Sequence, residues 1–316
     1  MADYLDALLG PQRRLPFLGD DDGGRLFHPY GARDCFGRAR GPAWWFGANP
    51  SHDREGVIVP QGESRLFEDA GIAIMQAGDT QLIADAGPMG SGGAGHSHAD
   101  ALSFVLRRGN EDLLIDAGTF TYVGDARWRA PNELLRALGR FGPPPYGGIA
   151  KWRDWFRGTA AHNTILIDRL DQATPVDPFR WADKPDVAIN AWRSNSGEDF
   201  LDATCRYRGL EHRRRIRFDK PNTISVVDEV TGPGGLHLLE QFWHSGEEVT
   251  EESPRNFRLG SGARLFLCHD ATLQIGGADG WRSRVFGSKE PAAVICMAWK
   301  QELPASFLTV IELDAQ

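Results

Sequence analysis

The sequence has little cysteine, no long apolar run and no excess of basic charge. Its four cysteines, Cys35, Cys205, Cys268 and Cys296, are scattered without a CxxC pair, which argues against a disulfide framework or a thiolate metal site. No apolar run approaches the roughly 18 residues that a membrane helix needs, so we expect no membrane partner. The net charge of −8 argues against a nucleic-acid partner, because the phosphate backbone attracts basic surfaces.

The N-terminus lacks the pattern of a secretory signal. The first residues, MADYLDALLGPQRR, carry acidic groups where a signal peptide is basic, so we expect none in this chain. Residues 3–9 predict a short helix that ends at Gly10 and Pro11. In the acidic run of residues 19–24, a turn is favoured over a calcium site because the ligand spacing of an EF-hand is missing.

Helical periodicity is nearly absent after residue 10, and short β segments separated by turn residues replace it. Gly78-Asp79 and Gly109-Asn110 predict the turns of two hairpins. Further strands are predicted at His162–Asp168, Phe200–Tyr207, Arg213–Phe218, Thr223–Val230, Leu236–His244, Arg264–Cys268, Ala293–Lys300 and Ser306–Leu313. This density of strands predicts an all-β fold, a multi-stranded antiparallel β-sandwich.

The β pattern also predicts how the chain is divided. Residues 1–35 are expected to form a short N-terminal extension, and residues 36–316 the β-sandwich domain. Residues 130–150, rich in glycine and proline, predict one long inserted loop over an end of the sandwich. The basic run 212–217 leads through Ile216 to Phe218, which predicts a strand with one solvated or substrate-facing edge.

The run GPMGSGGAGHSHADALSF, residues 87–104, carries the most chemistry. His96, His98 and Asp100 stand at a spacing of two, so an extended backbone would project them from one face. Two imidazoles and a carboxylate can bind a metal or move protons. A lone HxH pattern is more often part of a solvated loop, so evidence for a functional site must come from other segments of the chain.

Two further segments complete a set. Asp116 ends an apolar strand in LLIDAGTFTYVGD, and His162 opens one in WRDWFRGTAAHNTILID. Two histidines and an aspartate suit Zn²⁺. In a simple hairpin, however, Asp116 would lie roughly 16 Å from His98. Spacing alone therefore does not establish a shared metal unless residues 96–100 curl back.

In this order, the three segments resemble the signature of the heparinase II/III family of polysaccharide lyases, in its C-terminal β-sandwich domain. The resemblance runs from about Phe67 to about Leu313 and includes residues 211–214, 241–244 and 287–289. It implies a divalent metal, most simply Zn²⁺ with Ca²⁺ as the alternative. The ligands that it implies are His98, Asp116 and His162.

The resemblance further implies a β-elimination lyase that acts on an acidic, uronate-containing polysaccharide. His96 matches a histidine facing the substrate cleft and is the candidate catalytic residue, as base or as neutraliser of the carboxylate. Tyr122 and Tyr146 are the candidates to replace the tyrosine acid of the family, and packing is the alternative, favoured role for Tyr122. Substrate-binding candidates are Arg157 and Asn163, for the sugar acid, and Trp152 and Trp155, which either stack on sugars or pack in the core.

One departure from the family pattern limits the prediction. In the family, the active site lies between an N-terminal (α/α) toroid and the β domain, and this chain has no room for a toroid. Residues 1 to about 30 read as its remnant. The chain is then either a separated domain of a longer enzyme or a reduced relative, periplasmic or extracellular by analogy. The alternative is a non-catalytic carbohydrate-binding or metal-stabilised structural module; a cupin-like metal enzyme fits less well, because its ligands fall at other spacings.

Overall fold

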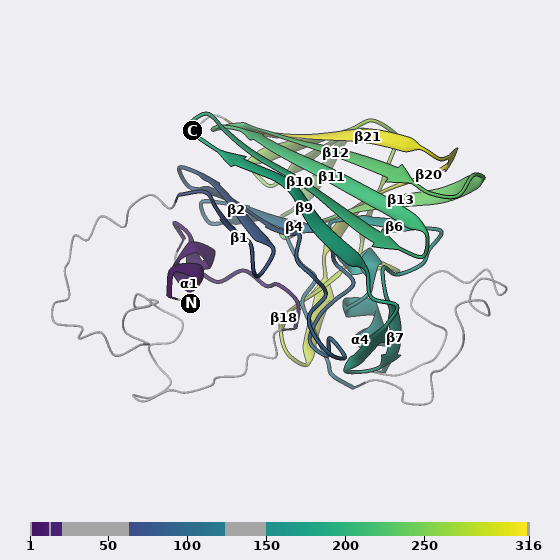
Figure 1. The fold of residues 1–316 in the computed structure, drawn as a ribbon. Helices are drawn as coiled ribbons and strands as arrows, with labels where there is room; N and C mark the ends of the chain where they lie inside the picture. Colours follow the sequence, from purple (N-terminus) through teal and green to yellow (C-terminus); the bar gives the residue numbers. More distant parts are fainter. Residues whose placement is uncertain (1, 13, 21–62, 124–149, 315–316) are drawn as a thin grey trace.

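The computed structural model describes residues 2–12, 14–20, 63–123 and 150–314. Three antiparallel sheets dominate this part of the chain (Figure 1). The first sheet contains, in chain order, β1 (Arg65–Phe67), β2 (Ile72–Ala77), β3 (Thr80–Asp85), β4 (Phe104–Arg108) and β5 (Glu111–Leu114). A four-stranded sheet has the order β17 (Thr272–Ile275), β20 (Ala293–Glu302), β13 (Leu236–Ser245) and β6 (Ile165–Ile167).

The eight-stranded sheet has the order β14 (Val249–Ser253), β15 (Asn256–Leu259), β16 (Ala263–Leu267), β21 (Ala305–Leu313), β12 (Thr223–Thr231), β11 (Leu210–Asp219), β10 (Glu198–Tyr207) and β9 (Asp186–Ser194). Small hairpins are formed by β7 (Thr174–Asp177) with β8 (Arg180–Ala182), and by β18 (Trp281–Val285) with β19 (Ser288–Pro291). The described helices are α1 (Ala2–Leu9), α4 (Ala150–Phe156) and the 3₁₀ helix η2 (Thr159–Ala161). No helix in the described ranges is long and apolar enough to cross a membrane.

The main core joins the eight-stranded sheet to the other two. Along β12, buried residues alternate with half-buried ones, as expected where one face of a sheet packs and the other is wet. The core takes Met75 from the first sheet, Ile216 from the eight-stranded sheet and Trp243 from the four-stranded sheet. The amide of Ile115 donates to the carbonyl of His244 at 2.9 Å, which joins the two smaller sheets at their edges. The predicted all-β sandwich is confirmed.

The predicted hairpins and most of the predicted strands are also confirmed. Gly78-Asp79 connects β2 to β3, and Gly109-Asn110 connects β4 to β5. Gly109 has φ +53°, a value that suits glycine in a tight turn. Strand β9 escapes prediction because it is half-exposed along most of its length and lacks regular alternation. Helix α4 was not expected either.

The basic run lies on β11, which has one solvated face as predicted, while its other face is buried. Arg213, Arg215 and Arg217 do point outward. His212 and Arg214 share the parity of Ile216 and Phe218, so their side chains enter the core and pair there with Asp228. A strand reverses its face at every residue, and only half of this run is therefore solvated.

The predicted N-terminal helix is confirmed as α1, which ends before Gly10 at φ +56°. Its Leu8 packs against Ile74 and Val105 of the first sheet. Arg107 donates to the carbonyls at the end of the helix, where a cation is favourable. The predicted boundary between residues 35 and 36, Tyr146 and nearly all of the inserted loop lie outside the described residues.

Candidate active site

The segment from His96 to Asp100 is a series of turns, so its predicted extended conformation is wrong. The amide of Ala99 donates to the carbonyl of Arg157 at 2.8 Å, and the amide of Leu102 donates to the carbonyl of Asp85 at 2.8 Å. Leu102 takes φ +64°, and β4 begins only at Phe104. The turn brings His98 to Asp116 and removes the 16 Å separation expected from a simple hairpin.

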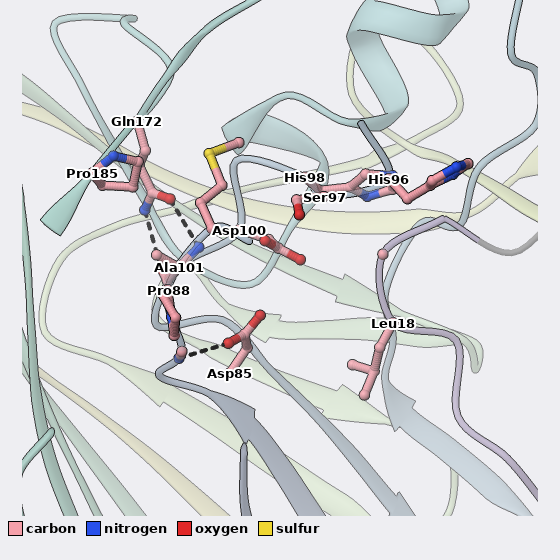
Figure 2. Close-up of a pocket in the computed structure, with 13 residues that line it drawn as sticks. Leu18, Asp85, Pro88, His96, Ser97, His98, Asp100, Ala101, Gln172 and Pro185 are labelled. Carbon is pink, nitrogen blue, oxygen red and sulfur yellow. Dashed lines mark hydrogen bonds between the residues drawn. The ribbon is translucent and has the colours of Figure 1, made fainter. Parts of the chain in front are cut away.

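Three buried side chains hold this turn in place. The amide of Gln172 accepts from the Ala101 N–H at 2.8 Å and donates to its carbonyl at 3.0 Å (Figure 2). The Thr164 hydroxyl donates to the same carbonyl at 3.0 Å, and Arg214 donates to the carbonyl of Leu102 at 2.7 Å. These long-range contacts satisfy backbone groups that a turn leaves without a sheet partner.

The turn gathers a candidate metal group. His98, Asp100, Asp116 and His162 each offer a ligand atom, and these atoms all lie within 4.8 Å of one another. Nδ1 of His98 and Nε2 of His162 are buried and have no hydrogen-bond partner among the described residues. Two unpartnered imidazole nitrogens beside carboxylates fit a divalent metal. The geometry thus brings the three predicted ligands together and adds Asp100.

Electrostatics in this group also suit a cation. Burial alone would raise the pKa of Asp116, but the imidazole of His162 holds it below its ordinary value; the nearer carboxylate oxygen is 2.9 Å from Nδ1 of His162. Burial and the charge of Asp100 raise the pKa of Asp85 to about 8. Figure 2 shows Asp85 and Asp100 directed into the same space. Such crowding of buried acids is relieved by a bound cation.

His96 lies at the mouth of the site, outside the metal group. Its side chain is 71% exposed, and its ring is 5.7 Å from the ring of Tyr122, the other predicted catalytic residue. Phe179 contacts both rings. A pocket of about 170 Å³ lies beside them and is lined by His96, His98, Asp100 and Leu18 among others.

Asp20 and Arg153 belong to this site, and sequence reasoning missed both. Asp20 accepts from Arg153 in a bidentate ion pair and lies 2.9 Å from Nε2 of His98 and 3.2 Å from Nδ1 of His96. Its side chain and that of Arg153 are fully buried. The acidic run at residues 19–24 was the available signal, but nothing local connects it to a histidine 76 positions away.

A family model described as Heparinase II/III-like, C-terminal, matches residues 59–306 of this chain. The chain belongs to this family. It is similar to a heparin-sulfate lyase from Bacteroides stercoris, with 24% identity over 246 residues that cover 74% of this chain and 31% of that protein. It is also similar to a heparin-sulfate lyase from Pedobacter heparinus, with 24% identity over 188 residues that cover 57% of this chain and 23% of that protein.

Solved structures give the same fold. The chain resembles the heparan sulfate lyase HepC from Pedobacter heparinus with a TM-score of 0.68 at 18% identity, covering 99% of this chain and 46% of that one. It resembles a heparinase III with a TM-score of 0.61 at 18% identity, covering 80% and 36%. This heparinase II/III-like chain therefore spans less than half the length of these relatives.

In this heparinase II/III-like domain, the side chain of Asn163 links three backbone segments by hydrogen bonds. Its side-chain amide donates to the carbonyls of Phe104 and Ile115 at 2.8 and 2.9 Å and accepts from the His244 N–H at 2.7 Å. It is fully buried, and each of its polar atoms already has a partner. The predicted contact with a sugar acid finds no support in this arrangement. Asn163 instead joins β4, β13 and the residue that follows β5.

The other predicted substrate contacts are also covered. Arg157 is 1% exposed, pairs with Asp154 and stacks on Trp181. Trp155 is 8% exposed and packs on Phe156 with ring centroids 4.6 Å apart. These two side chains have the roles of core residues.

Trp152 is half-buried and lies at the edge of the same aromatic cluster. Its ring is 5.9 Å from that of Trp155 and 5.5 Å from that of Trp281. Nζ of Lys289 lies 4.0 Å from the centre of the Trp152 ring, a cation–π contact. Of the two predicted stacking tryptophans, Trp152 is the one that keeps accessible surface.

His244 leads to a pH prediction. Burial lowers its pKa from 6.5 to about 4, and its Nε2 donates to the carbonyl of Ala160 at 2.9 Å. The unfolded chain takes up this proton below about pH 6.5 and the folded chain only below about pH 4. Stability should therefore fall by roughly 3 kcal/mol between these values. Urea unfolding of wild type and His244→Gln, both with EDTA, measures the difference; equal pH dependence in the two proteins would contradict the assignment.

Proposed function

We propose that this chain is the β-sandwich part of a polysaccharide lyase that cleaves uronate-containing polysaccharide by β-elimination. The observation that carries the proposal is the ring contact between Tyr122 and exposed His96, which is two residues from His98 of the metal group. Membership of the heparinase II/III-like family and the names of its relatives, heparin-sulfate lyases, support the substrate class.

The two side chains supply the acid and the base that elimination needs. His96 removes the proton from C5 of the uronate, next to the carboxylate. The electron pair of that bond forms a C4=C5 double bond, and the bond from C4 to O4 breaks. The hydroxyl of Tyr122 then gives its proton to O4 of the leaving sugar, so atoms and charge balance. The 5.7 Å between the ring centroids leaves one sugar within reach of both groups.

The metal group is proposed to hold a divalent cation, with His98, Asp116 and His162 as ligands and Asp100 beside them. Two imidazoles favour Zn²⁺ over Ca²⁺. The cation would neutralise the carboxylates of the group and connect three segments, which follow β3, β5 and η2. His96 is only two residues from His98, so the bound cation would also fix the position of the proposed base, His96, in the cleft.

The relatives have more chain than this protein, and we propose that an N-terminal toroid, on the same or another chain, completes the cleft. Two exposed apolar side chains lie beside Tyr122, Phe179 at 44% exposure and Phe286 at 40%. Both contact Tyr122. By analogy, a lyase for such polymers would act in the periplasm or outside the cell.

The burial of the metal group favours a second candidate, a metal-stabilised structural or carbohydrate-binding module. His98 is 2% exposed and His162 is fully buried, so a cation held there would stabilise the loops whether or not His96 turns over substrate. This reading predicts polymer binding without elimination.

The test is ultraviolet absorbance of the unsaturated uronate, measured with heparan, hyaluronan and alginate-type polymers. Wild type should release unsaturated product, and His96→Gln should lower kcat/KM by about 10²- to 10⁴-fold because it removes the base. His269→Gln is the matched control, an exposed histidine on the ring of Trp299. Polymer binding without product in wild type would reject lyase activity of this chain by itself and leave the binding module.

A further inference from the structure

The carboxylate of Asp20 bridges the two histidines of the HxH pattern. Its Oδ1 lies 2.9 Å from Nε2 of His98, and its Oδ2 lies 3.2 Å from Nδ1 of His96. It reaches them from the segment that follows α1, which Figure 1 shows running toward β18 and α4. One carboxylate therefore contacts the exposed histidine and the buried one at the same time.

The segment is held at this position by several contacts. The Asp20 N–H donates to the carbonyl of His96 at 3.3 Å, and the Thr119 hydroxyl donates to the carbonyl of Gly19 at 3.4 Å. Arg153 holds the carboxylate by a two-point ion pair and donates to the carbonyl of Gly95 at 3.2 Å. Arg153 thus fixes Asp20 and the backbone beside His96 together.

The protonation of Asp20 decides which ring nitrogens carry hydrogen. The two-point ion pair with Arg153 requires this carboxylate to be ionised. An ionised carboxylate only accepts hydrogen bonds, so each ring nitrogen facing it must be the N–H. His98 is then protonated on Nε2 and His96 on Nδ1.

These tautomers leave the useful lone pairs on the opposite nitrogens. His98 keeps its lone pair on Nδ1, a buried atom that has no partner among the described residues. His98 is itself a member of the metal group, and Nδ1 is its nitrogen that remains open to a ligand bond. His96 keeps its lone pair on Nε2, the nitrogen that does not face Asp20. An outer carboxylate that orients a histidine ligand also raises its basicity.

We propose that Asp20, held by Arg153, is a positioning residue that sets the tautomers of His96 and His98 in opposite senses. One carboxylate thereby prepares His98 Nδ1 as a metal ligand and His96 Nε2 as a proton acceptor. The catalytic use of His96 Nε2 rests on the proposed function; the two tautomers do not. The N-terminal segment is therefore part of the site rather than an appendage.

The experiment is ¹⁵N–¹H NMR of the metal-free full chain labelled on histidine, with signals assigned by His96→Gln and His98→Gln. The ¹⁵N shift of each ring nitrogen reports whether it carries hydrogen. Wild type should show a single Nδ1–H tautomer for His96 and a single Nε2–H tautomer for His98. In Asp20→Asn the amide can accept at only one of its two atoms, so at least one ring should become a mixture of tautomers.

Zinc affinity, measured by competition with a chelating dye, gives a second readout. Asp20→Asn should bind zinc about 10- to 100-fold more weakly than wild type. Asp202→Asn is the control, because Asp202 also accepts a two-point pair from an arginine, Arg213, but on the eight-stranded sheet. It should leave tautomers and affinity unchanged.

Several results would overturn the inference. Unchanged tautomers in Asp20→Asn would show that Asp20 does not set them. An unchanged zinc affinity of this variant would show that Asp20 does not prepare His98 as a metal ligand. An Asp20→Asn variant with faster elimination than wild type would make Asp20 an inhibitory plug of the cleft. Because the NMR is recorded without metal or substrate, a protein that fails the elimination assay still tests the tautomers.

Discussion

His162→Ala should remove most of the stabilisation of this domain by zinc. In wild type, free zinc at 1,000 times its Kd should add about 4 kcal/mol to the free energy of unfolding, since the ion binds only the folded chain. Removal of an imidazole that binds the metal directly should weaken zinc binding by more than roughly 100-fold, the upper value for loss of a residue that only hydrogen-bonds to a ligand. The same zinc concentration should then add about 1.4 kcal/mol or less.

The structure explains why His162 should have so large an effect. The ring is fully buried, 2.9 Å from Asp116 and 5.2 Å between ring centres from His98. His98 and His162 are the only described histidines in the metal group, whose ligand atoms lie within 4.8 Å of one another. Alanine would leave two carboxylates and one imidazole, a poorer set for zinc.

The measurement is urea unfolding of EDTA-treated protein with and without added zinc. His237→Ala is the matched control, because His237 also pairs with a carboxylate, Asp168, at 2.7 Å, but lies outside the metal group. It should keep the full response to zinc. An equal response in His162→Ala and wild type would refute the metal site.

Sequence periodicity predicts the strands of this fold well, because most of them have one face in the core. β12 and β21 alternate almost without interruption between buried and more exposed residues. β9 fails because an edge strand has little burial to impose a pattern. The buried Arg214 could have been expected, since it has the parity of Ile216 and Phe218 on the same strand.

The site is less predictable, because its geometry depends on long-range contacts with no local signature. The turn at Leu102 depends on Gln172 and Arg214, 70 and 112 positions along the chain. Family resemblance supplies His98, Asp116 and His162 without explaining how they meet. It does not supply Asp20. Asp100, suggested by spacing alone, returns to the metal group because the backbone curls.

A buried ion pair beneath the site gives the second large prediction. The carboxylate of Asp228 accepts from Arg214 at 2.7 and 3.0 Å, from His212 at 2.6 Å and from Gln241 at 2.8 Å, all inside the sandwich. Burial would raise its pKa, but Arg214 and His212 bring it to about 2. Its contribution to stability should be complete above about pH 4 and lost as the pH falls toward 2.

Asp228→Asn should therefore lower the free energy of unfolding by about 3 to 5 kcal/mol at neutral pH, because it leaves the guanidinium of Arg214 buried without its counter-charge. Arg214→Met should cost at least as much, since Arg214 also donates to the carbonyls of Leu102 and Asn163. The double variant should lose less than the sum of the two, because neither charge is then left unpaired.

Urea unfolding of the single and double variants measures the coupling, and an exposed pair supplies the comparison. Arg255 and Asp270 lie 2.6 Å apart with side chains 57% and 69% exposed, so Asp270→Asn should destabilise the protein far less than Asp228→Asn. If Asp228→Asn costs no more than Asp270→Asn, the buried pair does not stabilise the sandwich. A large cost would instead place Arg214 as the link between the core and the turn that carries His98, since the same guanidinium contacts both.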